Sequence, residues 1–316
     1  MAKQMRAALY EEFGGLDKIK IGQLEVPELK EGEVLVRIKA AGVNPVDYAV
    51  REGYLKDFLP TNFPVIPGWD VAGVVEDRGY SARRFEAGDQ VYAYARRPVV
   101  QYGTFAEYIV LPESYLAKAP ESISWEEAAG IPLVGLTAYQ SLFDVGQLQQ
   151  VHSVLILGAS GGVGSLAIQL AKYKGASVIG VASEKNHAFM KELGADHTID
   201  YKKGNVGEAV KEIAPDGVDL IFDCVSGETL EQSLPALKPN GKLVSILNRG
   251  ENLDPNIDFT YVFVEPNSKQ LEHLREITDA GQLKVHVSQT YSLDETAEAL
   301  KQIQTLHTTG KIVIVP

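Results

Sequence analysis

The sequence predicts an α/β protein with two domains, one rich in β-strands and one built on a doubly wound parallel sheet. The first third of the 316-residue chain alternates apolar and polar residues with a period of two, which is typical of half-buried strands. From about residue 151, continuous Val/Ile/Leu runs alternate with helical stretches that end in Gly, and a parallel sheet covered on both faces requires this pattern. A loop with four glycines opens this second region.

The β-rich region ends where a helical region begins. In its clearest strand, Val34, Val36 and Ile38 share one face. Turn residues bound the strands of this region, which are predicted at 32–43, 85–95 and 103–112. Ser124 and Glu127 have the spacing of a capping box, so the helical region is predicted to start there.

The second region alternates strands and helices in chain order. Strands are predicted at 154–158, 177–183, 218–225 and 242–247, with helices at 162–175, 186–195 and 228–241 between them. After about residue 262 come a helix at 269–281, a strand at 286–293, a helix at 294–306 and a strand at 310–316. From the pattern alone, this tail completes either domain.

Composition excludes several classes of function. The formal net charge of −12 and the lack of a basic run with interleaved aromatics argue against nucleic acid as a partner. No apolar stretch approaches the roughly 18 residues of a membrane-spanning helix. Cys224 is the one cysteine, and the first residues lack the apolar core of a signal peptide, so we expect a cytoplasmic protein.

The glycine loop at 158–164 is predicted to bind a dinucleotide. It follows a buried strand and opens a helix, and a second strand closes a βαβ unit of about 30 residues. Glycines admit a pyrophosphate, and the helix N-terminus offers free N–H groups and a positive dipole end. The alternative is a turn that only allows close strand–helix packing. The residues expected to contact the dinucleotide are Gly158, Ser160, Gly161, Gly162 and Val163.

The end of the second strand of this unit bears on which dinucleotide is bound. Glu184 lies at about the distance where an NAD site places a carboxylate for the ribose 2′-OH. Ser183 and Lys185 flank it, and a hydroxyl with an ammonium suits a 2′-phosphate better. Tyr201, after the next strand, adds a hydroxyl donor. We therefore predict NADPH rather than NADH.

Several motifs in this order resemble the medium-chain dehydrogenase/reductase superfamily, in its zinc-independent NADPH:quinone oxidoreductase branch. Besides the glycine loop, the matching segments are residues 40–53, 63–75, 88–93, 103–110, 126–139, 193–201 and 310–314. The resemblance implies a GroES-like β domain formed by residues 1–124 and 263–316, and a Rossmann domain formed by residues 125–262. It also implies a homodimer, with residues 242–247 as the edge strand that pairs.

Zinc is not expected, although alcohol dehydrogenases of this superfamily bind it. Where those enzymes carry a metal-binding Cys this sequence has Asn44, and where they carry His-Glu it has Trp69-Asp70. The six histidines show no paired ligand spacing. Without a Lewis acid, the favoured chemistry is reduction of an electron-poor substrate, a quinone or an α,β-unsaturated carbonyl, by hydride from NADPH.

The candidate catalytic residues are Asn44, Tyr48 and Tyr54. Asn44 can donate an amide hydrogen bond, and the resemblance implies a place beside the nicotinamide ribose. The two tyrosines are candidate proton donors, although a phenol with an ordinary pKa near 10 is a slow acid and water is the alternative. Asp47 is expected to fix the loop through backbone N–H groups.

The remaining coenzyme contacts are expected near the nicotinamide. They are Asn44, Thr137, Cys224, Val225, Asn248 and Phe263, the last within the stretch 261–264 after the last predicted strands. Cys224 is assigned to packing, without nucleophilic duty. Two other functions stay open at this stage. They are a 2-enoyl-thioester reductase and a non-catalytic NADPH-binding protein, crystallin-like or regulatory.

Overall fold

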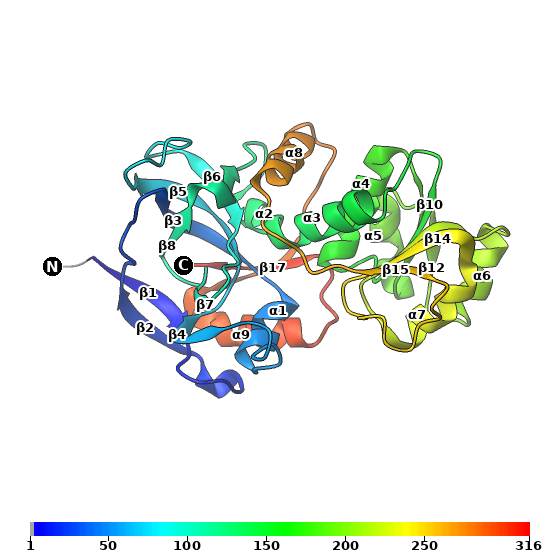
Figure 1. The fold of residues 1–316 in the computed structure, drawn as a ribbon, viewed down its shortest axis with the longest axis horizontal. Coiled ribbons are helices and arrows are strands. Elements are labelled where there is room, and N and C mark those ends of the chain that lie inside the picture. The colour runs from blue at the N-terminus through cyan, green and yellow to red at the C-terminus, as the bar shows by residue number, and fades with distance from the viewer. Residues whose placement is uncertain (1–2) are drawn as a thin grey trace. The chain divides into compact units, whose positions relative to one another are not determined.

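The computed structural model describes residues 3–316, which divide into two compact units (Figure 1). The first unit comprises the described residues up to Leu133 together with Glu265–Gly281 and Val285–Pro316. The second comprises Val134–Val264 and Gln282–Lys284. The tail beyond residue 264, which the pattern left open, thus belongs almost wholly to the first unit.

The first unit is built on a seven-stranded sheet with the order β16-β17-β3-β5-β6-β9, in which β8 also pairs with β3. These strands are β3 (Glu33–Val43), β5 (Asp70–Arg78), β6 (Gln90–Tyr94), β8 (Tyr108–Pro112), β9 (Leu116–Lys118), β16 (Val287–Ser292) and β17 (Lys311–Val315). Val34, Val36 and Ile38 of β3 are buried as predicted. Two small sheets accompany it, formed by β1 (Gln4–Leu9) with β2 (Lys20–Glu25) and by β4 (Thr61–Ile66) with β7 (Val100–Tyr102).

Strand β17 joins residues far apart in the sequence. It runs antiparallel to β3 with Ile312 opposite Val43 and Ile314 opposite Ala41, and β16 covers its other side. The red strand therefore lies beside the blue β3 in Figure 1. Ile312 and Ile314 enter the same hydrophobic core as the inward residues of β3.

Four helices belong to the first unit: α1 (Pro45–Arg51), α2 (Trp125–Ala129), α8 (Ser268–Asp279) and α9 (Thr296–Gln304). Helix α2 begins where the sequence predicts. The Ser124 hydroxyl accepts from the Glu127 N–H at 3.2 Å, and the Glu127 carboxylate accepts from the Ser124 N–H at 2.8 Å. This confirms the capping box. Helix α2 contacts β3 and β5, so the first unit extends beyond the expected boundary at residue 124.

The second unit is built on a six-stranded parallel sheet with the order β12-β11-β10-β13-β14-β15. In chain order this is 3-2-1-4-5-6, the order of dinucleotide-binding doubly wound sheets. The strands are β10 (Ser153–Leu157), β11 (Ser177–Val181), β12 (His197–Ile199), β13 (Val218–Asp223), β14 (Leu237–Ser245) and β15 (Asp258–Tyr261). Its helices are α4 (Gly162–Lys174), α5 (His187–Glu192), α6 (Val206–Ile213) and α7 (Gly227–Ser233).

Three expectations about elements are wrong. The helix expected at 228–241 ends at Ser233, and β14 already begins at Leu237. The helical region that starts at Ser124 is interrupted, because Pro132 lacks an N–H group and starts a new helix, α3 (Pro132–Tyr139), which runs into a π-helical turn, η3 (Gln140–Val145). Residues 242–247 are not an edge strand either. Strand β14 pairs with β13 on one side and with β15 on the other, and the sequence pattern gave no strand at 258–261. The homodimer itself stays a prediction.

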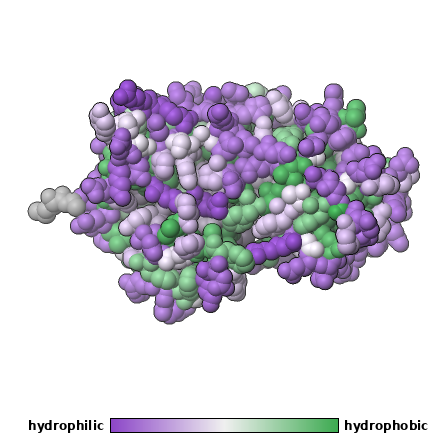
Figure 2. Space-filling model, viewed as in Figure 1, coloured by the Kyte–Doolittle hydropathy of each residue, from purple (hydrophilic) through white to green (hydrophobic). Residues whose placement is uncertain are grey.

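Polar side chains dominate the face that Figure 2 presents, in keeping with a charged-residue content of 23%. Within residues 3–316, no helix has the length and apolar character needed to cross a bilayer.

Loss of the Ser124 cap is expected to destabilise the first unit. Ser124→Ala leaves the Glu127 N–H without its side-chain acceptor, which costs about 1 kcal/mol in the free energy of unfolding. Urea unfolding of the variant and of the control Ser177→Ala, at an exposed strand position, measures it. Equal stabilities for both variants would contradict the role of the cap.

Candidate functional site

The glycine loop connects β10 to α4 in a geometry that side chains would block. Gly158 has φ +74°, and a Cβ there would lie 2.7 Å from Val225 Cγ1. A Cβ on Gly164 would lie 2.4 Å from the Gly158 carbonyl oxygen, so the first turn of α4 packs directly against the loop backbone. Gly161 is the N-cap of this 13-residue helix and has no side chain to cover its N–H groups. The loop therefore leaves room and donors for a phosphate at the carboxyl end of β10.

Asn186 links the glycine loop to the end of the neighbouring strand. Its Nδ2 donates to Ser160 Oγ at 2.9 Å and lies 3.4 Å from Ser183 Oγ. Two expected contact residues are thus brought together by a third that the sequence analysis missed. The signal was an amide side chain three residues after Ser183, and only the three-dimensional contact shows its use.

Glu184 is engaged by a lysine from the next loop. Lys203 Nζ lies 2.6 Å from Glu184 Oε1, and this hydrogen bond raises the pKa of Lys203 above its ordinary value. Lys185 is exposed on the same short turn as Glu184, and Tyr201 is 39% exposed two residues before Lys203. The Glu184 carboxylate, which an NAD site would use for the ribose 2′-OH, is therefore paired with Lys203. Lys185 is a second lysine near the carboxyl end of β11.

A second polar network orders the carboxyl ends of β13 and β14. Asp223 Oδ1 accepts from the N–H groups of Val225 and Ser226, and Asp223 Oδ2 accepts from Ser245 Oγ at 2.6 Å. Ser245 Oγ in turn accepts from the Asn248 N–H at 2.8 Å. The sequence analysis missed Asp223 and Ser245, which fix two of the expected contact residues, Val225 and Asn248.

Cys224 suits the packing role expected of it. It follows β13 directly, and burial raises the pKa of its thiol well above the ordinary value, which disfavours the nucleophilic thiolate. At the same edge of the sheet, Val225 is 43% and Phe263 39% exposed, so apolar side chains are available there for a flat ring. Thr137 is buried on α3.

Asn44 lies in a buried polar cluster of the first unit, which we call the Lys311 cluster: Asn44, Asp47, Asp70 and Lys311. All four are at most 4% exposed. The Asn44 amide is already bonded, since Nδ2 donates to Asp70 Oδ2 at 2.8 Å and Oδ1 accepts from Lys311 Nζ at 2.6 Å. Asn44 thus holds the cluster together, because its amide nitrogen and its amide oxygen each have a partner inside the cluster.

The Lys311 cluster does not fit a zinc ion. Residues 3–316 hold no group of three His, Cys, Asp or Glu side chains able to bind a metal. At the position where zinc enzymes carry ligands, the Asn44 and Asp70 oxygens already face an ammonium, and Lys311 Nζ lies 3.6 Å from Asp70 Oδ2. Zinc needs three or four Cys, His or carboxylate ligands that converge on one point, and this cluster offers two carboxylates, no Cys or His, and an ammonium in their place.

Asp47 fixes the start of α1, as expected. Its Oδ2 accepts from the Asn44 N–H at 2.7 Å, and the Gly68 backbone also bonds the carboxylate. Burial raises the pKa of Asp47 to about 7, although these hydrogen bonds favour the charged form.

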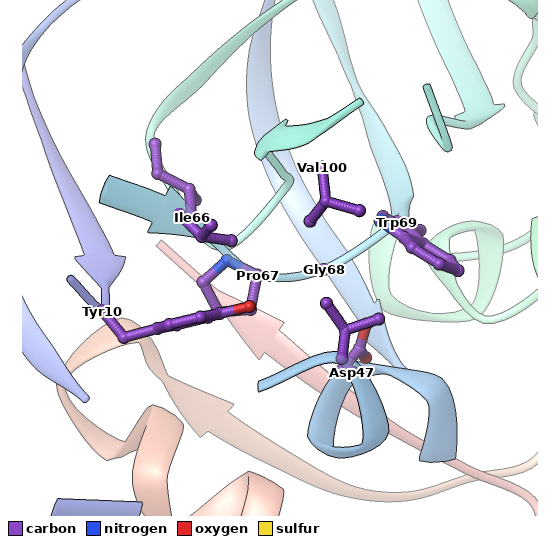
Figure 3. A pocket seen from close by; sticks show the side chains of 9 residues that line it. Tyr10, Asp47, Ile66, Pro67, Gly68, Trp69 and Val100 are labelled. Atoms are coloured by element: carbon purple, nitrogen blue, oxygen red, sulfur yellow. The ribbon is translucent and has the colours of Figure 1, made fainter. Parts of the chain in front are cut away.

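Asp47 lines a small cavity with Tyr10 and Trp69, and Figure 3 shows the Tyr10 ring extending toward Pro67. The Tyr10 hydroxyl has no hydrogen-bond partner within the described part of the chain.

The two candidate proton donors differ in surroundings. Tyr48, on α1, is half-buried and packs against the core of the first unit. Tyr54 is 67% exposed, and its hydrogen bond to Glu52 raises the pKa of its phenol. A raised pKa makes Tyr54 a still weaker acid at neutral pH.

Comparison with known proteins finds two family models that match the chain. The model described as "Alcohol dehydrogenase GroES-like domain" matches residues 30–121, and the one described as "Zinc-binding dehydrogenase" matches residues 193–314.

Full-length relatives cover both units. An NADPH-dependent alkenal/one oxidoreductase of Arabidopsis thaliana is 35% identical over 99% of this chain and 80% of its own length. A 2-methylene-furan-3-one reductase of Solanum lycopersicum is 35% identical over 99% of this chain and 79% of its own length. The structure of the Coxiella burnetii quinone oxidoreductase superposes with a TM-score of 0.91 at 32% identity, covering 99% of this chain and all of the other.

The raised pKa of Asp47 predicts a pH-dependent stability. The ordinary value is 3.8, so between about pH 4 and pH 7 the folded chain keeps a proton that the unfolded chain has lost. This contribution favours the folded state below pH 4 and is lost as the pH rises through 7. Relative to wild type, Asp47→Asn should gain about 2 kcal/mol in the free energy of unfolding between pH 5 and pH 8.

Urea unfolding of both proteins from pH 5 to pH 8 measures this gain. Asp57→Asn, at an exposed position, is the control for a lost surface charge. A difference between wild type and Asp47→Asn that stays constant over this range would show that Asp47 titrates alike in both states.

Proposed function

Because the chain belongs to the quinone oxidoreductase branch of the medium-chain dehydrogenase/reductase superfamily, we propose that it is an NADPH-dependent reductase of quinones or α,β-unsaturated carbonyls that works without zinc. The chain is an oxidoreductase with a nicotinamide coenzyme, as the family models and the relatives at 35% identity establish. The choice of NADPH, the lack of a metal and the site residues are our proposal.

The glycine loop at the carboxyl end of β10 is the observation that carries the proposal. Gly161, the N-cap of α4, makes no side-chain cap hydrogen bond, so the first N–H groups of this helix keep their capacity to donate. These groups would bind the pyrophosphate, together with Ser160, which Asn186 orients. The apolar side chains of Val225 and Phe263 would contact the nicotinamide ring.

The charges at the end of β11 support NADPH over NADH. A free carboxylate at Glu184 would repel a 2′-phosphate, but Lys203 pairs with it. Ser183 and Lys185 then offer a hydroxyl and an ammonium, which suit a phosphate dianion. Tyr201 would add a third donor. The relative named as NADPH-dependent agrees with this choice.

The chemistry of the first unit supports reduction of an electron-poor substrate. When bound, the reduced nicotinamide supplies a hydride, which an enone accepts at its β-carbon or a quinone at its ring. The chain must then provide a proton at the enone α-carbon or at a quinone oxygen. Tyr48 is our candidate donor, with water as the alternative. Asn44 holds the segment before α1 in place. Two relatives, an alkenal/one oxidoreductase and a 2-methylene-furan-3-one reductase, support an enone as the substrate.

Absorbance at 340 nm tests the function directly. NADPH and NADH are supplied in parallel against an ortho-quinone, a para-quinone, a short alkenal and an enoyl thioester. We expect consumption of NADPH with a quinone or the alkenal. Tight NADPH binding without turnover of any of the four would contradict the proposal and favour a binding protein.

Lys185→Ala tests the 2′-phosphate contact. Loss of one charge-assisted hydrogen bond costs roughly 1.5 to 3 kcal/mol, so the Kd for NADPH should rise about tenfold or more while the Kd for NADH hardly changes. Fluorescence titration of each coenzyme measures both constants. Lys191→Ala, an exposed lysine on α5, is the matched control. Equal losses for NADPH and NADH would mean that Lys185 does not contact the phosphate.

A further inference from the structure

A lysine ammonium is buried at the junction of β17 and β3. Lys311 is 4% exposed, and its Nζ donates to the Val43 carbonyl oxygen at 3.0 Å and to Asn44 Oδ1 at 2.6 Å. Asp70 Oδ2 lies 3.6 Å away. Burial lowers the pKa of Lys311, and the charge of Asp70 opposes this. Three oxygen atoms from two different strands and the segment between β3 and α1 therefore share one ammonium.

The ammonium determines which way the Asn44 amide points. An ammonium has only donors and a carboxylate only acceptors, so the amide oxygen must face Lys311 and the amide nitrogen must face Asp70. Asp70 is fixed in turn, because its Oδ1 accepts from the Leu133 N–H at 2.7 Å. Gly42 makes room for this carboxylate, since a Cβ there would lie 3.0 Å from Asp70 Oδ2.

We propose that Lys311 is a positioning residue whose buried ammonium holds the segment Val43–Tyr48 in place for the reaction. Its ammonium donates to Val43, the last residue of β3, and to Asn44, the residue before α1. Tyr48 belongs to α1. Asp47 extends this hold by accepting from the Asn44 N–H. The inference rests on the proposed function for the role of Tyr48, but the hold on the segment does not.

The competing explanation is that Lys311 only balances the charge of Asp70. A buried carboxylate without a partner destabilises the fold, so any single loss at either residue lowers stability under both explanations. The two explanations separate when both charges are removed together. Lys311→Met/Asp70→Asn restores charge balance and keeps an acceptor for the Leu133 N–H, but it leaves the Val43 carbonyl without its donor and removes both charges that fix the direction of the Asn44 amide.

The experiment compares Lys311→Met, the double variant and the control Lys301→Met, an exposed lysine of α9, with wild type. We expect Lys311→Met to lower the thermal midpoint by roughly 5 °C or more, and the double variant to regain most of it. We expect kcat to stay at least about tenfold down in both, with the Kd for NADPH within about threefold of wild type.

Amide hydrogen exchange gives a readout that does not need turnover. In the double variant, exchange at residues 43–51 should be faster than in wild type, while exchange in the second unit stays unchanged. Wild-type exchange in this segment together with wild-type kcat would overturn the proposal and leave Lys311 as a charge partner only. If wild type turns over no electrophile, the proposed function fails, and the exchange result still decides the role of Lys311.

Discussion

The first unit depends on a cluster of charged side chains that it buries together. Two carboxylates and one ammonium are buried together at Asp47, Asp70 and Lys311, and isolated charges of this kind cannot stay ionised in an apolar core. The chain offsets part of this cost with donors: the Asp70 carboxylate accepts from the Asn44 amide and the Leu133 N–H, and the Asp47 carboxylate accepts from the Asn44 N–H. Because these groups come from β3, α1, β5 and β17, satisfying the charges also fixes how the central strands meet the helix that carries Tyr48.

In the second unit, polar side chains hold other residues in place at the carboxyl edge of the parallel sheet. A parallel sheet collects all of its strand ends at one edge, and the groups needed to bind a charged coenzyme must be held there by neighbours. Asn186 holds Ser160, and Asp223 with Ser245 holds Val225 and Asn248. The residues that we propose as coenzyme contacts are therefore held in place by side chains outside the proposed contact set.

Local patterns in the sequence predicted the parts that local chemistry determines. The Ser124 capping box, the glycine loop before α4 and the alternation in β3 all depend on residues a few positions apart, and the structure has each of them. The partners of Asn44 and Glu184 were missed because Lys311 and Lys203 reach them from distant segments. Strand β15 was missed because Asp258–Tyr261 is short and only half-buried, so its pattern is that of a loop. The break at Pro132 has a local signal in the sequence, because proline lacks a backbone N–H group and cannot continue a helix.

The pairing of β17 with β3 has a consequence for synthesis. The second unit consists almost entirely of Val134–Val264, so its parallel sheet can form while later residues are still on the ribosome. The sheet of the first unit cannot close at that stage, since β17 is an interior strand that pairs with residues about 270 positions earlier. Until Lys311 emerges, Ala41–Val43 of β3 lack their partner strand and the Asp70 carboxylate lacks the ammonium that faces it. A nascent chain therefore combines a folded second unit with an unpaired strand edge in the first. Chaperones or neighbouring nascent chains can bind to such an edge.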